Sequence, residues 1–170
     1  MSDRNKKSNT DEEIPNIHWA DHVAEELIEK HPQKEKFVCA SGISPSGVVH
    51  IGNFREAITV DFVVRALLDR SKSVRFLYSW DDYDAFRKVP VNLPDQEMLK
   101  KHLRQPISLV PDPFGQYPSY AAHFEKRFEA EIAQLGVKPD YIYQNKPYRE
   151  GKYIQGIKDA LAKEKEIMTV

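Results

Sequence analysis

FVCASGISPSGVVHIGN, residues Phe37–Asn53, begins as a short apolar run and ends where a helical pattern starts. Between these two parts lies a loop that contains Gly42, Pro45 and Gly47. A strand, a glycine-containing loop and a helix start, in this order, bring unpaired backbone N–H groups close to a ligand. The first turn of the helix adds a partial positive charge. The stretch therefore predicts a phosphate-binding loop.

The residues that follow predict a strand–helix–strand unit. A helical pattern with a wide apolar side runs from about His50 to Arg70 and predicts a largely buried helix. VRFLYSW, residues Val74–Trp80, has the apolar and aromatic content of a buried strand. Two strands joined by a helix in roughly 45 residues pair in parallel, with a right-handed crossover. We therefore expect an α/β fold with an incomplete, Rossmann-like parallel sheet.

Weaker patterns flank this unit. Residues 1–13 are polar and charged without periodicity, and we expect a disordered tail over about residues 1–15. The further expected elements are a helix from Ile17 to His31, a proline-rich excursion over residues 92–115 with a short helix from Asp95 to Leu103, a helix from Tyr117 to Leu135 stopped by Gly136, a strand from Asp140 to Gln144, and a last helix from Glu150 to Met168.

Composition restricts the class of protein. The 170 residues suffice for one domain with a core, and a net charge of −1 gives no support to strong non-specific nucleic-acid binding. No apolar run approaches the ~20 residues of a membrane span, and the N-terminus lacks the apolar segment of a signal peptide. The single Cys39 cannot form an internal disulfide. These features predict a cytoplasmic protein without a membrane partner.

The loop and the helix start carry the side chains that could bind phosphate. Glycines let the backbone approach a ligand, and the hydroxyl of Ser44 or Ser46 is expected to cap the helix. His50 can donate a hydrogen bond to a phosphate oxygen, and Gly52 leaves a flat surface for a base. The alternative is an ordinary loop with a capping serine, because the glycine spacing matches neither common phosphate-loop pattern. The candidate residues are Gly42, Ser44, Pro45, Ser46, Gly47, His50, Gly52 and Asn53.

An acidic run, Asp81, Asp82 and Asp84, directly follows the second expected strand. Ligands of open α/β sheets bind at the carboxyl ends of the strands, so Asp81 is expected to point into a cleft. The alternative for the other two aspartates is a solvated loop in which Asp84 pairs with Arg87 or Lys88.

The combination Pro-Ser-Gly-x-x-His-Ile-Gly-Asn resembles the HIGH signature of class I aminoacyl-tRNA synthetases, with Asn53 in place of the final histidine. The similarity extends from about Trp19 to the end of the chain, through YSWDDYDAFRKVPVNLP, RQPISLVPDPFG and SYAAHFEKRFE. These stretches resemble the N-terminal half of the catalytic domain of class I lysyl-tRNA synthetase. The resemblance implies the HUP-type Rossmann-like fold over residues 16–170, with a connective insertion that starts in about residues 90–150.

The resemblance also implies a reaction. The carboxylate of lysine attacks ATP to give lysyl-adenylate, and the lysyl group then moves to tRNA(Lys), with Mg²⁺ accompanying ATP. By similarity, His50 and Asn53 are the catalytic positions. The implied ATP-binding residues are Pro45, Ser46, Gly47, His50, Gly52 and Asn53. Lysine is implied to contact Gly42, Ser44 and Asp81, with Asp81 binding the α-ammonium.

The absence of an arginine from the first strand bears on which amino acid is the substrate. The related glutamyl enzymes hold the substrate carboxylate with an arginine on the first strand, and Ala40 occupies the matching position here. Without that cation, lysine is favoured over glutamate. Groups that bind the ε-ammonium are not evident in the sequence, and a position beyond Val170 stays open.

A zinc site is not expected in this segment. Family members often carry an Asp, a Cys-His pair and a further His in the proline-rich region. Here Asp112 and His123 are kept, but Gln116 and Tyr117 stand at the Cys-His positions. Two ligands rarely make a structural zinc site, so His123 is interpreted as a packing residue.

Scattered basic residues are interpreted as a solvated face, with contact to the tRNA acceptor end as the alternative. These residues are Lys126, Arg127, Lys146, Arg149 and Lys152.

The second signature of the family, Lys-Met-Ser-Lys-Ser, and the anticodon-reading domain are absent from the 170 residues. We therefore expect the remainder of a synthetase chain as a partner and weak or no aminoacylation by this chain alone. The alternatives are a truncated paralogue that binds nucleotide or tRNA without catalysis, and a small nucleotidyltransferase.

Overall fold

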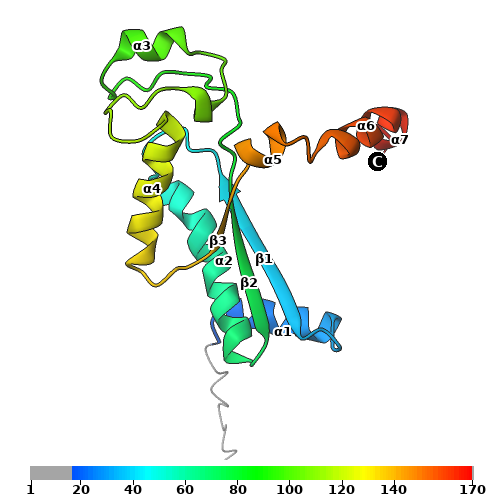
Figure 1. Ribbon diagram of the computed structural model, residues 1–170. Coiled ribbons are helices and arrows are strands. Elements are labelled where there is room, and N and C mark those ends of the chain that lie inside the picture. The colour runs from blue at the N-terminus through cyan, green and yellow to red at the C-terminus, as the bar shows by residue number, and fades with distance from the viewer. Residues whose placement is uncertain (1–16, 170) are drawn as a thin grey trace, which may run out of the picture.

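A computed structural model describes residues 17–169, and the expected tail lies outside them. The described part forms a three-stranded parallel sheet of order β1-β2-β3 (Figure 1). The strands are β1 (Lys36–Ile43), β2 (Ser73–Trp80) and β3 (Asp140–Tyr143). The predicted α/β fold with a parallel sheet is confirmed. β1 continues past the expected loop start, so Gly42 lies in the strand.

The helices follow the predicted order, except at the C-terminal end. They are α1 (Trp19–Lys30), α2 (Ile51–Asp69), α3 (Gln96–Lys101), the 3₁₀ helix η1 (Ile107–Leu109), α4 (Tyr120–Ala133), α5 (Asn145–Arg149), α6 (Ile154–Ala162) and α7 (Glu164–Ile167). The expectation of one helix over residues 150–168 is wrong. Gly151 has a φ of +73°, which separates α5 from α6, and Lys163 leaves helical geometry between α6 and α7.

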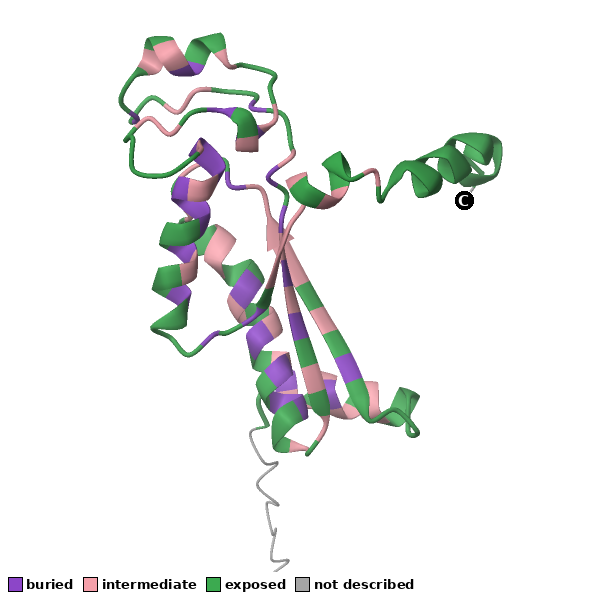
Figure 2. Ribbon diagram, in the orientation of Figure 1, coloured by how far each residue is buried: buried purple, intermediate pink, exposed green. Residues whose placement is uncertain are grey.

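The main core lies on one face of the sheet. Tyr78 and Trp80 of β2 are fully buried there and pack against Phe128 of α4 and Val64 of α2. Side chains alternate across a strand, so the intervening residues of β2 point to the other face. On that face Val38 of β1 is 60% exposed. The predicted buried strand is thus buried on one face, where helices cover Phe76, Tyr78 and Trp80 (Figure 2).

α2 also buries less of its surface than the sequence pattern suggested. Ala57, Val64 and Leu67 are buried, whereas Phe62 is 40% exposed and Leu68 is 51% exposed. The helix therefore buries the side that carries Ala57, Val64 and Leu67 and leaves the apolar side chains of Phe62 and Leu68 partly exposed.

The proline-rich excursion forms a second core of its own. Leu99, Ile107 and Val110 pack with Tyr120 and Phe124 of α4, which anchors the excursion to the body of the molecule. The Tyr120 hydroxyl donates a 2.8 Å hydrogen bond to the carbonyl oxygen of Ser46. This second core therefore fixes the loop between β1 and α2.

A buried carboxyl group on α4 predicts a pH-dependent stability. Glu125 is 4% exposed, and its Oε1 has no hydrogen-bond partner among the described residues. Burial, together with the nearby carboxylates of Asp82 and Glu129, raises the pKa of Glu125 from 4.5 to about 8. Above pH 4.5 the unfolded chain releases this proton while the folded chain keeps it, so stability falls as pH rises toward 8.

Glu125→Gln is expected to abolish this loss of folding stability, which amounts to on the order of 3 kcal/mol between pH 5 and 8. Urea unfolding at both pH values measures it. Glu131→Gln, an exposed position on the same helix, serves as the matched control and should leave the pH dependence unchanged. Equal pH slopes for Glu125→Gln and the parent chain would contradict the assignment.

Within residues 17–169, no helix combines the length and the apolar character that crossing a membrane requires.

Candidate functional site

The start of α2 is capped by His50. Its Nδ1 accepts a 3.1 Å hydrogen bond from the backbone N–H of Gly52. The expectation that Ser44 or Ser46 caps this helix is wrong, because neither hydroxyl reaches its first turn as a cap. Since Nδ1 is the acceptor, the proton of a neutral His50 lies on Nε2, which can donate to a ligand.

The loop glycines have different local roles. A Cβ at Gly52 would lie 2.9 Å from Cε1 of His50, so glycine makes room for the capping ring. A Cβ at Gly47 would make only an ordinary contact with the Tyr120 hydroxyl, at 3.9 Å. Pro45, before Gly47, is fully buried, and Asn53, after Gly52, donates its backbone N–H to the carbonyl oxygen of His50.

Gly42 allows β1 and β2 to approach each other. It pairs with Ser79 in the sheet register, and a Cβ at position 42 would lie 2.4 Å from the carbonyl oxygen of Ser79. Real Cβ atoms essentially never make so short a contact, so the residue is required by strand packing.

A hydrogen bond joins the end of β1 to the acidic run. The Ser44 hydroxyl donates to Oδ2 of Asp84 at 2.5 Å. The alternative in which Asp84 pairs with Arg87 or Lys88 is therefore wrong, because its partner among the described residues is the serine.

The acidic run contains one buried carboxylate, Asp82, and two exposed ones, Asp81 and Asp84. Asp82 is 2% exposed and accepts hydrogen bonds from the backbone N–H and the Nδ2 of Asn145, at 2.6 and 2.8 Å. Burial raises the pKa of Asp82, against the effect of these donors. The solvated alternative is thus wrong for Asp82, which holds the start of α5 against the end of β2. Asp81 is exposed and accepts a 3.2 Å hydrogen bond from the Ser79 hydroxyl.

Asp81 lines a cavity of about 410 Å³ with an aromatic wall. The ring centroids of Tyr83 and Tyr148 are 5.2 Å apart at an angle of 18°, and Tyr153 lies 4.8 Å from Tyr148. The full lining is Asp81, Tyr83, Asp84, Gln144, Tyr148 and Tyr153. The tyrosines were not predicted as site residues. Their one sequence signal is that Tyr148 and Tyr153 follow the third parallel strand, at the edge where ligands bind.

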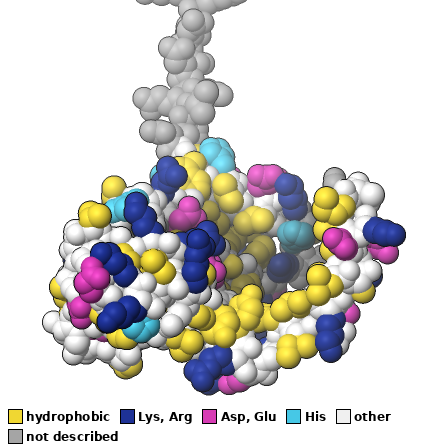
Figure 3. Space-filling view, turned by 90° about the horizontal axis from the view of Figure 1, so that it is seen from above, with side chains coloured by type: hydrophobic (Ala, Val, Ile, Leu, Met, Phe, Trp, Pro, Cys, Tyr) yellow, Lys and Arg dark blue, Asp and Glu magenta, His cyan; other side chains and the backbone are white. Residues whose placement is uncertain are grey.

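A second cavity, of about 560 Å³, lies on the other side of Asp84. It is lined by Ser44, Ser46, Asp84, Ala85, Phe86, Arg87, Lys88, Pro90, Val91, Asn92 and Ile107. Seen from above, the molecule is hollowed between the lobe that carries α3 and the arm of α6 and α7 (Figure 3). Because Asp84 lines both cavities, they are neighbours.

The predicted single cleft is divided in the structure. Ser44 and Ser46 line the 560 Å³ cavity and Asp81 lines the 410 Å³ cavity, whereas His50 lines a third one of about 250 Å³ with Phe54 and residues of α4. The structure thus brings together Ser44, Asp81 and Asp84, but not His50 with them.

The two retained residues of the zinc-like pattern contact each other. Nδ1 of His123 lies 3.2 Å from Oδ1 of Asp112. Burial opposes ionisation of Asp112, but hydrogen bonds from the backbone N–H of Phe114, Tyr117 and Gln116, together with His123, lower its pKa below the ordinary value. Over residues 17–169, no group of three or more His, Cys, Asp or Glu side chains is arranged to hold a metal ion. That this segment binds no zinc stays a prediction.

Three of the five scattered basic residues form ion pairs. Lys126 pairs with Glu129, Arg127 with Glu131, and Lys152 with Glu150. These pairs favour the solvated-face interpretation over an RNA contact for the three residues concerned.

The sequence matches a known family over nearly its whole described length. A family model described as "tRNA synthetases class I (K)" matches residues 17–170. The chain belongs to this family. The predicted resemblance is confirmed, and family membership argues against the small nucleotidyltransferase.

Three relatives of the chain are lysine–tRNA ligases. The chain is 53% identical over 154 residues to the lysine–tRNA ligase of Treponema pallidum (strain Nichols) and 49% identical to that of Thermococcus kodakarensis. It is 44% identical to lysine–tRNA ligase 1 of Methanosarcina acetivorans. The alignments cover 91% of this chain but only 29%, 29% and 28% of the respective relatives. The chain therefore spans less than a third of their length.

Proposed function

We propose that this chain forms the part of a lysine–tRNA ligase that binds lysine, and that the 410 Å³ cavity beside Asp81 is the lysine site. The observation that carries the proposal is the pairing of two carboxylates with three tyrosine rings around one cavity at the carboxyl ends of the strands. The names of the relatives support the choice of amino acid.

Lysine matches this cavity group by group. Its α-ammonium pairs with Asp81, which is exposed at the end of β2. Its four methylene groups can lie along the rings of Tyr83 and Tyr148, and an ammonium over an aromatic face is attracted by the ring quadrupole. Asp84 supplies the second negative charge.

Glutamate does not match the 410 Å³ cavity. No lysine or arginine is among the described residues that line the cavity, so a substrate carboxylate would face Asp81 and Asp84 without a cation. Ala40 on β1 supplies no positive charge either. Charge in the site thus selects for a cationic amino acid.

For ATP we keep the loop and the helix start as the proposed site: Pro45, Ser46, Gly47, His50, Gly52 and Asn53. His50 would donate from Nε2 to a phosphate oxygen, since its Nδ1 already accepts from Gly52. The first turn of α2 adds the positive end of its dipole. Mg²⁺ accompanying ATP would neutralise part of the phosphate charge, with no ligand assigned to it from this chain.

The proposed chemistry then needs no covalent enzyme intermediate. A lysine carboxylate oxygen bonds to the α-phosphorus of ATP while the bond to pyrophosphate breaks. A ribose hydroxyl of tRNA next attacks the acyl carbon, and AMP leaves. The chain contributes positioning of the two reactants and electrostatic stabilisation of the phosphate oxygens.

Isothermal titration calorimetry with lysine, norleucine and glutamate tests the amino acid site. Norleucine has the same four-carbon side chain but no ε-ammonium. Lysine is expected to bind at least about tenfold more tightly than norleucine, which corresponds to about 1.4 kcal/mol for one charged contact, and glutamate should give no heat. Equal binding of lysine and norleucine, or measurable binding of glutamate, would contradict the proposal.

A further inference from the structure

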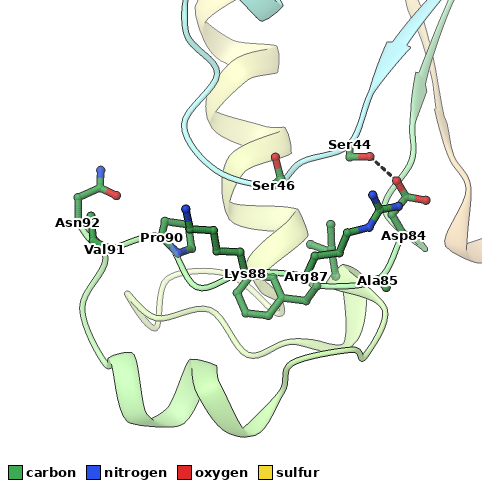
Figure 4. Close-up of a pocket in the computed structure, with 11 residues that line it drawn as sticks. Ser44, Ser46, Asp84, Ala85, Arg87, Lys88, Pro90, Val91 and Asn92 are labelled. Atoms are coloured by element: carbon green, nitrogen blue, oxygen red, sulfur yellow. Dashed lines mark hydrogen bonds between the residues drawn. The ribbon is translucent and has the colours of Figure 1, made fainter.

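The two carboxylates that line the 410 Å³ cavity each accept a hydrogen bond from a serine hydroxyl. Asp84 accepts from Ser44 (Figure 4), and Asp81 accepts from Ser79 at 3.2 Å. Ser79 lies on β2 and does not line the cavity itself. Its hydroxyl therefore acts on the cavity through Asp81.

Ser79 is held in turn by Gln144, the residue that directly follows β3. Nε2 of Gln144 donates to Oγ of Ser79 at 2.7 Å, although the two residues are 65 positions apart in sequence. A hydroxyl group has one proton to donate and two lone pairs that accept. Because Gln144 occupies one lone pair, the proton of Ser79 points away from the amide, and Oδ1 of Asp81 is the acceptor that it reaches.

The orientation of the Gln144 amide is fixed from its other side. The Tyr153 hydroxyl donates to Oε1 of Gln144. An amide oxygen only accepts and an amide NH₂ group only donates, so this contact turns the NH₂ group toward Ser79. The hydrogen bonds thus run in one direction, from Tyr153 through Gln144 and Ser79 to Asp81.

Backbone hydrogen bonds hold both ends of this relay. The N–H of Asp81 donates to the carbonyl oxygen of Ile43 at 3.0 Å, and the N–H of Gln144 donates to that of Trp80 at 3.1 Å. The side chain of Asp81 is nevertheless exposed, and within residues 17–169 Ser79 is the one side chain that donates to it. Without that donor, the carboxylate would be free to change rotamer.

We propose that Gln144 is a positioning residue for lysine binding, which acts through Ser79 and holds the carboxylate of Asp81 in one rotamer. A carboxylate that is already oriented loses less conformational freedom when it pairs with an ammonium group, so the relay raises the affinity. The inference rests on the proposed function, because it takes Asp81 as the partner of the α-ammonium.

Calorimetry with lysine on the full 170-residue chain tests the relay through a double-mutant cycle. Ser79→Ala and Gln144→Met, which keeps the length of the side chain, are each expected to raise the Kd about fivefold, as for one neutral hydrogen bond. Because both act on the same carboxylate, the double variant should also lose about fivefold instead of the roughly 25-fold of independent effects. Gln155→Met is the matched control, since it removes a 2.8 Å hydrogen bond to Asp159 on the exposed face of α6. It should bind lysine like the parent chain.

The cycle separates the relay from direct contact. Gln144 lines the cavity and could touch lysine itself, in which case the two losses would add. A double variant about 25-fold weaker than the parent, or a Kd for Ser79→Ala equal to the parental one, would overturn the relay.

NMR of the lysine-free chain gives a readout that does not depend on the proposed function. Three-bond couplings to the Cγ of Asp81 report its χ1 angle, and we expect one rotamer in the parent and in Gln155→Met but averaged rotamers in Ser79→Ala and Gln144→Met. Averaged couplings in the parent, or a single rotamer in both relay variants, would overturn the relay. A parent chain that binds no lysine would overturn the lysine site instead, and the couplings alone would then decide whether Gln144 positions Asp81.

Discussion

Asp81→Asn is expected to raise the Kd of the chain for lysine about 100-fold. Asparagine keeps the size and the position of the side chain but removes the charge that we propose pairs with the α-ammonium. A hydrogen bond between two charged groups contributes about 1.5–3 kcal/mol, and 100-fold corresponds to about 2.7 kcal/mol. The Ser79 hydroxyl, which now donates to Asp81 at 3.2 Å, can donate to the amide oxygen in its place, so the fold should be unaffected.

Asp69→Asn is the matched control. Asp69 is exposed at the C-terminal end of α2, and the substitution removes the same charge. Calorimetry should give the parental Kd for this variant, and circular dichroism should give the parental melting curve for both. A Kd for Asp81→Asn within twofold of the parent would place lysine elsewhere.

Gly42→Ala is expected to lower the free energy of unfolding by about 3 kcal/mol, through overpacking between β1 and β2. The new Cβ would lie 2.4 Å from the carbonyl oxygen of Ser79 and 2.9 Å from its Cβ. The first of these atoms belongs to the backbone of the paired strand, so the sheet must open locally. Urea unfolding at constant pH measures the effect.

Gly156→Ala provides the control for this substitution. Gly156 lies in α6, and a Cβ there meets nothing within 4 Å. Alanine is favoured over glycine in a helix by about 1 kcal/mol, so this variant should be neutral or slightly stabilised. Equal stability of Gly42→Ala and the parent would show that the strands can separate at no cost, against the role given to Gly42.

The sheet and the long helices could be predicted because their patterns are local. β2 alternates buried and partly exposed residues up to Trp80, and α2 repeats its apolar positions over nineteen residues. The prediction of one last helix failed for a local reason as well: the tyrosine and isoleucine spacing is helical, but Gly151 adopts a positive φ before α6 and Lys163 leaves helical geometry after it.

The candidate site could be predicted only in part. Asp81 was predicted because a carboxylate at a strand end is a local signal, and it lines the 410 Å³ cavity, while its role in binding lysine stays a prediction. The burial of Asp82 was not predicted, because its partner Asn145 is 63 residues away in sequence. The tyrosine wall also depends on this contact, since Asn145 fixes α5 beside Tyr83. The helix cap was assigned to a serine by propensity, whereas the loop geometry brings the imidazole of His50 to the Gly52 N–H.

A crystal structure of the chain with a non-hydrolysable lysyl-adenylate analogue tests whether the 410 Å³ cavity binds lysine. We expect the α-ammonium of the lysyl group within hydrogen-bond distance of Asp81 and its aliphatic chain against Tyr83 and Tyr148. A lysyl group bound outside the 410 Å³ cavity, with Asp81 still facing solvent, would contradict it.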